Sequence, residues 1–255
     1  MLNENILLHG QETPPTPSLA LRAGPLTMVF DPELAFLRYI RLGDHEIVRN
    51  IYAVVRDQNW NTIAWRVSNL QADVRSDSFD VTFDVVCQER EVHYAWKGAV
   101  RVDASGKVTF SFDGEAKSNF RRNRIGICVL HPIVECAGRT VTLEHSDGVR
   151  EETLFPKPIA PWQPFKDVRA LTQEVAAGVS AELRFEGEVF ETEDQRNYGD
   201  TSFKTYSTPQ DLPKPVAVAP GDRVRHTFTL TLQNPEQKKV LPVVQGRGAD
   251  RKSVV

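Results

Sequence analysis

From residue 26 onward, short apolar runs alternate with turn-forming residues. The runs are rich in valine, isoleucine, phenylalanine and tyrosine, and many of them alternate apolar with polar positions, which is the pattern of half-buried strands. They cover residues 26–30, 35–42, 47–55, 65–70, 78–89, 92–102, 108–115, 179–185, 188–193 and 223–232. This pattern predicts an all-β protein built as one large antiparallel β-sandwich over residues 26–244.

Helical spacing is confined to one segment. In residues 164–175, a proline is followed by Val168, Leu171 and Val175 at roughly helical intervals, so we expect a short helix there. Residues 209–220 contain four prolines and are expected to form an extended connector.

The two ends of the chain differ from this pattern. Pro14, Pro15 and Pro17 favour an extended lead-in over residues 1–25. Residues 250–255 match the translation of a common sequencing adapter, so we expect residues 245–255 to be a truncation artefact and the natural chain to continue into further domains.

Charge and composition narrow the classes of partner. The 255 residues carry a formal net charge of -3, with an isoelectric point of about 6.1, which gives no electrostatic basis for binding nucleic acid or an anionic membrane. The first residues lack the basic and apolar regions of a signal peptide, and no apolar run is long enough for a membrane span. We therefore expect a cytoplasmic protein whose partner is a small molecule or another protein.

Cysteine and histidine spacing indicates neither a disulfide nor a metal site. Cys87, Cys128 and Cys136 lie in strand-like segments without a CxxC pair, and we expect them to be reduced and buried. The six histidines show no spacing typical of metal ligands, so neither a metal nor another cofactor is predicted. GxSxG, P-loop and GxGxxG motifs are absent from the sequence, which removes common hydrolase, kinase and dehydrogenase classes.

Residues 190–206 form the densest polar stretch of the chain. Alternation places Glu191, Glu193 and Gln195 on one face of a strand and Thr192 and Asp194 on the other, with Phe190. Crowded carboxylates raise one another's pKa, which suits proton transfer, and nearby cations can stabilise an oxyanion. A structural salt-bridge network is the alternative interpretation.

A second polar stretch, residues 119–132, places three arginines before an apolar strand that ends at His131. Arginine forks suit carboxylates and sugar hydroxyls, and a histidine can transfer protons near neutral pH. A solvated strand entry and a structural histidine are the alternatives.

These two stretches, 122–132 and 193–206, resemble the signatures of the D-apionate lactonase family. The resemblance covers about residues 24–244 and corresponds to the N-terminal β domain of that family. It implies hydrolysis of a sugar-acid lactone in the catabolism of apiose. The layout is also similar to the galactose-mutarotase-like supersandwich. Two further domains of the family, one barrel-like and one β-rich, have no counterpart in this sequence.

Under this resemblance we assign the residues of a lactonase site as a hypothesis. Glu193 or Asp194 is the general base, and His131 is the proton donor to the leaving alkoxide. The residues expected to hold the substrate or its oxyanion are Arg122, Arg124, Arg196, Asn197, Asp200, Lys204 and Tyr206.

Two other functions stay open at this point. A non-catalytic carbohydrate-binding domain would present a shallow face with stacked tryptophans, drawn from Trp60, Trp65, Trp96 and Trp162. An aldose 1-epimerase would need a histidine and a carboxylate facing each other across a pocket. Convergence of His131, Arg124 and residues 190–206 on one concave pocket, with crowded carboxylates, would favour catalysis.

Overall fold

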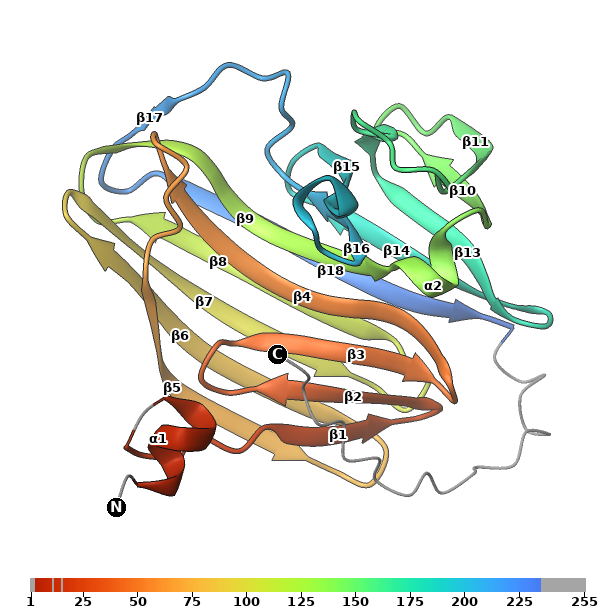
Figure 1. Ribbon diagram of the computed structural model, residues 1–255, viewed down its shortest axis with the longest axis horizontal. Coiled ribbons are helices and arrows are strands. Elements are labelled where there is room, and N and C mark those ends of the chain that lie inside the picture. The colour runs from red at the N-terminus through yellow and green to blue at the C-terminus, as the bar shows by residue number, and fades with distance from the viewer. Residues whose placement is uncertain (1–2, 11, 15, 235–255) are drawn as a thin grey trace.

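The fold consists of two β-sheets packed face to face. The structure is a computed structural model, which describes residues 3–10, 12–14 and 16–234. Within these residues each sheet has nine strands, and all the pairings are antiparallel. Figure 1 shows the sheets stacked with their strands running in broadly similar directions. The prediction of an all-β sandwich is confirmed.

The first sheet carries both polar stretches identified in the sequence. Its strands, in spatial order, are β1 (Leu19–Ala23), β2 (Leu26–Asp31), β3 (Phe36–Leu42), β4 (His45–Asp57), β9 (Phe120–Pro132), β16 (Ser202–Tyr206), β15 (Phe190–Asp194) and β12 (Phe165–Val168), with β17 (Val216–Val218) paired to β9. The strands β9 and β16, far apart in sequence, are therefore neighbours.

The second sheet forms the other wall of the core. Its strands, in spatial order, are β11 (Arg150–Leu154), β10 (Thr140–Glu144), β13 (Ala170–Ala176), β14 (Val179–Glu186), β18 (Arg223–Gln233), β8 (Val108–Ala116), β7 (Val92–Val102), β6 (Phe79–Glu89) and β5 (Trp65–Val74). The helical segments are α1 (Glu4–His9), α2 (Ile133–Cys136) and the 3-10 turn η1 (Gln195–Tyr198). None of the described helices is long and apolar enough to cross a membrane.

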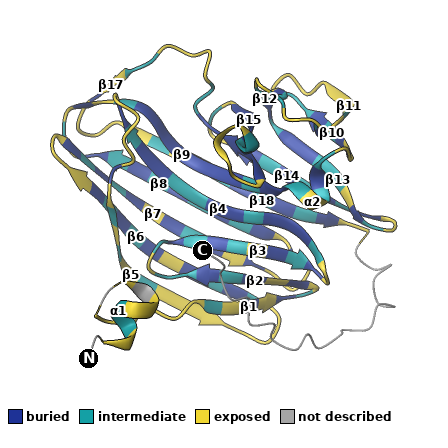
Figure 2. Cartoon of the chain, in the orientation of Figure 1, coloured by how far each residue is buried: buried dark blue, intermediate teal, exposed yellow. Residues whose placement is uncertain are grey.

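Period-2 alternation builds the core between the sheets. In β6 and β7 every second side chain is buried (Figure 2), because successive side chains of a strand point to opposite faces. Phe83 and Trp96 meet edge to face, with ring centroids 5.5 Å apart, a geometry that aromatic pairs prefer. The three cysteines are buried and free, as predicted.

The helix predicted over residues 164–175 is wrong. The segment forms β12 in the first sheet and β13 in the second, and the chain crosses between the sheets at Arg169. Leu171 and Val175 are both buried, and an interval of four fits one face of a strand as well as one face of a helix. The interval of three from Val168 to Leu171, which imitates a helical turn, arises because the chain changes sheets between them.

Residues 1–25 contain two elements that the sequence reading did not identify. The helix α1 begins after Asn3, whose side chain accepts a hydrogen bond from the backbone N–H of Asn5. The strand β1 pairs with β2 through a tight turn at Gly24. The segment 245–255, expected to be a truncation artefact, lies outside the described residues.

A buried histidine of the second sheet touches the backbone of β9. The Nδ1 atom of His226 accepts a hydrogen bond from the N–H of Ile127 at 3.3 Å. Gly126 has a φ of 144°, and a Cβ atom there would lie 2.2 Å from Cε1 of His226. Only glycine combines this backbone conformation with such a close approach.

Replacement of Gly98 by alanine tests the packing of the core. Gly98 lies opposite Phe83 in the β6–β7 register, and an added Cβ would be 2.2 Å from the Phe83 ring. We expect Gly98→Ala to lower the free energy of unfolding by about 1–3 kcal/mol through overpacking, measured by urea denaturation. Ala99→Ser, at the next and less buried position, should change it by less than about 0.5 kcal/mol. Equal stability of the Gly98→Ala and wild-type proteins would contradict this packing.

Candidate functional site

The strands β15 and β16 form the centre of the polar region. They pair antiparallel, with Glu193 opposite Lys204 and Glu191 opposite Tyr206, and β16 pairs in turn with β9. In Figure 1 they lie next to β9, within the first sheet. Every residue of both strands is buried, although most of them are polar. Such burial requires partners for the polar groups.

The pleat divides these residues between two environments. Phe190 and Phe203 belong to the hydrophobic core between the sheets, and alternation therefore directs Thr192, Asp194 and Thr205 to the same inner face. The residues that alternate with them point to the outer face; they are Glu191, Glu193, Lys204 and Tyr206. As predicted, Glu191 and Glu193 therefore point to one face of the strand, and Asp194 points to the other.

A pocket of about 400 Å³ lies on the outer face. It is polar, but it also includes two aromatic residues, Trp60 and Tyr198, that are exposed to solvent. Its lining residues are Arg56, Trp60, Arg124, Glu193, Gln195, Tyr198, Lys204 and Gln210. The two polar stretches of the sequence therefore converge here through Arg124, Glu193, Gln195 and Lys204.

Glu193 and Lys204 form an ion pair at the base of this pocket. The Nζ atom of Lys204 contacts Oε1 of Glu193, and the Gln195 side chain donates to the same oxygen at 2.7 Å. Lys204 also donates to Oε1 of Gln195 at 3.3 Å. Both charged residues are less than one tenth exposed. Lys204 and Gln195 together hold the Glu193 carboxylate in one orientation. All three side chains line the pocket and keep this part of it polar.

Tyr206 supports the pocket from beneath. Its hydroxyl donates to Oε1 of Glu191 at 2.7 Å, and Glu191 also accepts from the backbone N–H of Gln210 at 2.7 Å. Burial, followed by the negative charge of Glu193, raises the pKa of Tyr206 well above its ordinary value. The phenol therefore stays protonated and keeps its role as a donor to Glu191.

Arg124 lies across the Tyr206 ring. Its guanidinium carbon is 3.7 Å from the centre of the Tyr206 ring and 5.4 Å from that of Trp60, which is cation–π geometry. The residue is 3% exposed. Its Nε and Nη2 atoms are buried and have no hydrogen-bond acceptor among the described residues. Leaving such a donor unpaired costs about 1–3 kcal/mol.

The structure places His131 away from this pocket. Its side chain is on the inner face of β9, where Nε2 shares a 2.7 Å hydrogen bond with the Thr205 hydroxyl. The ring lies 6.0 Å from that of Phe155. Burial lowers the pKa of His131 to about 3, so the ring is neutral at physiological pH. The expected meeting of His131 with Glu193 does not occur. His131 points to the inner face of the first sheet, whereas Glu193 points to the outer face and lines the pocket together with Arg124.

Asp194, Arg196 and Asn197 form a clamp that orders a neighbouring loop. Asp194 accepts from Nε and Nη2 of Arg196 at 2.9 and 2.6 Å. Arg196 also donates to the backbone carbonyls of Pro156, Lys157 and Pro158. Asn197 donates to two further backbone carbonyls. These hydrogen bonds engage the three side chains with the protein itself, outside the pocket lining.

Two further predicted residues also lie outside the pocket lining. Arg122 contacts Glu188 at 3.6 Å, and Glu188 in turn lies 3.7 Å from the buried His226 of the second sheet, so Arg122 is directed toward the space between the sheets. Asp200 is exposed in the turn between η1 and β16. Arginine spacing alone could not separate Arg122 from Arg124, because an interval of two predicts the same face of a strand, whereas the β4–β9 register shifts between these two residues.

Five lining residues are not among the predicted site residues: Arg56 of β4, Gln195 and Tyr198 of η1, and Trp60 and Gln210 of loops. Of these, Trp60 was considered only as a sugar-stacking ring. Arg56 lies directly opposite Arg124 in the β4–β9 register and donates to the Trp60 carbonyl at 3.1 Å. Alternation along β4 could have identified Arg56, since it shares the face of Tyr52 and Val54. The loop residues carry no such periodic signal.

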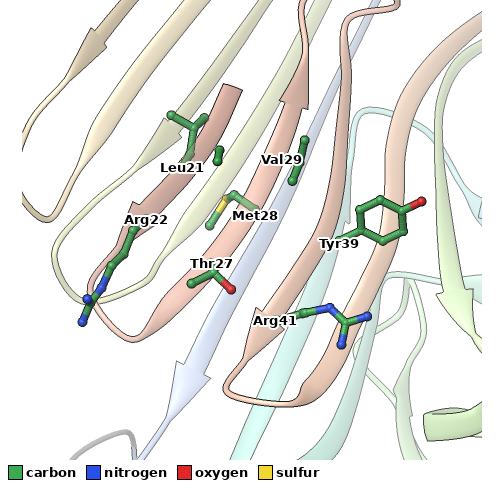
Figure 3. Close-up of a pocket in the computed structure, with 8 residues that line it drawn as sticks. Leu21, Arg22, Thr27, Met28, Val29, Tyr39 and Arg41 are labelled. Carbon is green, nitrogen blue, oxygen red and sulfur yellow. The ribbon is translucent and has the colours of Figure 1, made fainter. Parts of the chain in front are cut away.

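A larger hollow, of about 700 Å³, lies over the strands β1, β2 and β3. Figure 3 shows its side chains on three adjacent strands. They are Ala20, Leu21, Arg22, Thr27, Met28, Val29, Tyr39 and Arg41. This lining contains no carboxylate or imidazole, so it offers no base for hydrolysis, and the smaller polar pocket is the candidate site.

A metal centre is not formed by the described residues. Among them, no group of three or more histidine, cysteine, aspartate or glutamate side chains is arranged to hold a metal ion. The acids nearest the pocket, Glu191 and Glu193, are engaged by Tyr206, Gln210, Gln195 and Lys204.

Comparison with known proteins identifies relatives in sequence and in fold. The family model described as D-apionate lactonase, N-terminal domain, matches residues 6–235. A D-apionate lactonase of Brucella anthropi is 38% identical over 213 residues, which are 83% of this chain and 35% of the relative. The chain thus spans about a third of the length of that curated relative.

Two solved structures share the fold at low sequence identity. An aldose 1-epimerase candidate from Escherichia coli K12 has a TM-score of 0.53 and 11% identity, covering 85% of this chain and 99% of its own. The Slr1438 protein of Synechocystis sp. PCC 6803 has a TM-score of 0.53 and 9% identity, covering 86% and 96%. The galactose-mutarotase-like architecture expected from the sequence is confirmed.

The buried neutral state of His131 predicts a pH-dependent stability. The folded-state pKa of about 3 is below the unfolded value of about 6.5. The unfolded chain therefore binds the proton first as the pH falls through 6.5, and stability decreases between pH 6.5 and 3. From pH 6.5 to 5 we expect His131 to account for a loss of about 2 kcal/mol, measured by urea unfolding at each pH.

Two variants check the assignment. His131→Gln should remove this part of the pH dependence, because glutamine does not titrate. His93→Gln, at a less buried position, should retain it. An unchanged slope in His131→Gln would show that another group is responsible.

Proposed function

Since this chain belongs to the D-apionate lactonase family, as its N-terminal domain, we propose that its polar pocket binds a sugar-acid lactone and takes part in its hydrolysis. The single observation that carries the proposal is the oriented Glu193–Lys204 pair, buried at the base of an open pocket. Ester hydrolysis needs a base for water and a cation for the developing oxyanion. This pair supplies both within one site.

The proposed reaction uses Glu193 as the general base. The recorded contacts of this carboxylate use Oε1, so Oε2 accepts the proton when water attacks the lactone carbonyl. The negative charge that forms on the carbonyl oxygen is stabilised by Lys204 and Arg124. The ring C–O bond then breaks, and Glu193 returns the proton to the leaving oxygen, which becomes a hydroxyl. The product is the open-chain sugar acid.

His131 and Asp194 have no part in this version of the mechanism. His131 is buried on the inner face, and Asp194 is held by Arg196. Arg196 and Asn197 are positioning residues that order the loop beside the pocket. Tyr206 supports Arg124 and Glu191 from below.

The rival functions find less support in the geometry. An aldose 1-epimerase needs a histidine facing a carboxylate, and no histidine is among the residues that line this pocket. A purely carbohydrate-binding face fits the exposed Trp60 and Tyr198 rings, but it does not account for a buried ion pair beneath them.

Substitution of Glu193 tests the proposal. In a full-length family member carrying this domain, Glu193→Gln should lower kcat for sugar-lactone hydrolysis by about 100-fold or more, because the base is lost while the side-chain shape is kept. The measurement is acid release in a pH-stat, with sugar lactones and free aldoses as alternative substrates.

Glu152→Gln is the matched control, since Glu152 is exposed on the edge strand β11 and should leave kcat unchanged. Full activity of a folded Glu193→Gln variant would refute the catalytic role. Lactone binding without turnover by the wild-type full-length protein would favour the carbohydrate-binding function instead.

A further inference from the structure

The guanidinium of Arg124 is packed against aromatic rings, but two of its hydrogen-bond donors have no acceptor among the described residues. Its guanidinium carbon lies 3.7 Å from the centre of the Tyr206 ring and 5.4 Å from that of Trp60, so both rings are within cation–π range of the group. Stacking uses the faces of a guanidinium and leaves its in-plane N–H groups free to donate. Nε and Nη2 are buried donors that have no acceptor among the described residues.

Another arginine of this chain shows what these two atoms can hold. Arg196 uses Nε and Nη2 together to grip both oxygens of Asp194, at 2.9 and 2.6 Å. This is the bidentate geometry in which one edge of the fork matches a planar carboxylate. Arg124 has the same edge without a carboxylate.

The nearby acids do not satisfy Arg124. Glu191 accepts hydrogen bonds from Tyr206 and Gln210, and Glu193 is paired with Lys204. Arg56 stands opposite Arg124 on the next strand and adds a second positive charge. The pocket lining therefore carries three cations and one acid, and it attracts an anionic ligand.

We propose that Arg124 is a carboxylate-binding fork, which takes the carboxylate of an open-chain sugar acid through Nε and Nη2. The choice of a sugar acid rests on the proposed function, whereas the preference for a carboxylate rests on the fork itself. As a consequence, the pocket binds the ring-opened anion more tightly than the neutral lactone, and the product inhibits the reaction.

Trp60 controls access to this fork. Both donor atoms lie beneath the surface and the Trp60 ring is 5.4 Å from the guanidinium carbon, so the carboxylate reaches them when the indole changes position. Trp60 is 39% exposed and adopts a φ of 66°, in a turn that Asp57 holds by accepting from the backbone N–H groups of Asn59 and Asn61. The turn is thus fixed at its base, and the residue at its tip is partly open to solvent.

Binding measurements with three matched five-carbon probes test the proposal. D-ribonate, D-ribono-1,4-lactone and D-ribose are titrated separately into the wild-type protein by calorimetry. We expect ribonate to bind at least 10-fold more tightly than either neutral probe, and its affinity to fall as salt rises. Equal affinity for all three would overturn the proposal without any variant.

Arg124→Lys keeps the positive charge but removes the fork. It should weaken ribonate binding by 10-fold or more and lactone binding by less than 3-fold. Arg101→Lys, at an exposed position on β7, should change neither. Ribonate affinity unchanged in a folded Arg124→Lys protein would overturn the assignment to Arg124.

Indole fluorescence gives an independent readout. Ribonate should change the emission of the wild-type protein, and Trp60→Phe should abolish that change while the other three tryptophans remain. An undiminished change in Trp60→Phe would refute the role of Trp60 in access.

The two proposals fail separately. Ribonate preference in a protein that hydrolyses no lactone would leave the fork in place and remove the lactonase function. Lactone hydrolysis without ribonate preference would remove the fork alone.

Discussion

The pleat of the β15–β16 pair governs the rest of the polar region. Successive side chains of a strand must point to opposite faces, so a stretch dense in polar residues is divided in two. One half faces the core and is satisfied by threonine hydroxyls, by His131 and by the Asp194–Arg196 pair. The other half faces outward and makes the base of the pocket. Neither half can change its face without a shift of register.

This division explains why two buried ion pairs with different surroundings lie so close together. Asp194 and Arg196 neutralise each other and tie three backbone carbonyls into place. Glu193 and Lys204 also neutralise each other, but one side of their pair borders a pocket. A buried ion pair does not by itself stabilise a fold. The first pair is an element of local architecture, and the second is the pair on which the proposed lactonase site depends.

The fold was predictable from the sequence because its strands carry strong alternation, and β6, β7 and β8 appear almost as expected. The segment around Leu171 resembles a helix in sequence because the chain changes sheets between Val168 and Leu171, and the interval from Leu171 to Val175 fits a strand and a helix equally well. Within the site, alternation correctly separated Glu193 from Asp194. It could not exclude His131, because which face of β9 is inward depends on the packing of distant strands. Trp60 and Gln210 come from loops, whose positions only the tertiary structure defines.

The contact between Gly126 and His226 has a consequence for how this family can diversify. Positions that line the pocket away from the Glu193–Lys204 pair, such as 56 and 198, can accept new side chains without disturbing the core, so a combinatorial library for altered substrate preference belongs there. Position 126 does not belong in such a library, although it lies only two residues from Arg124. A side chain there would collide with the imidazole of the opposite sheet. Residues 126 and 226 should therefore vary together among homologues, even though 226 is remote from the pocket.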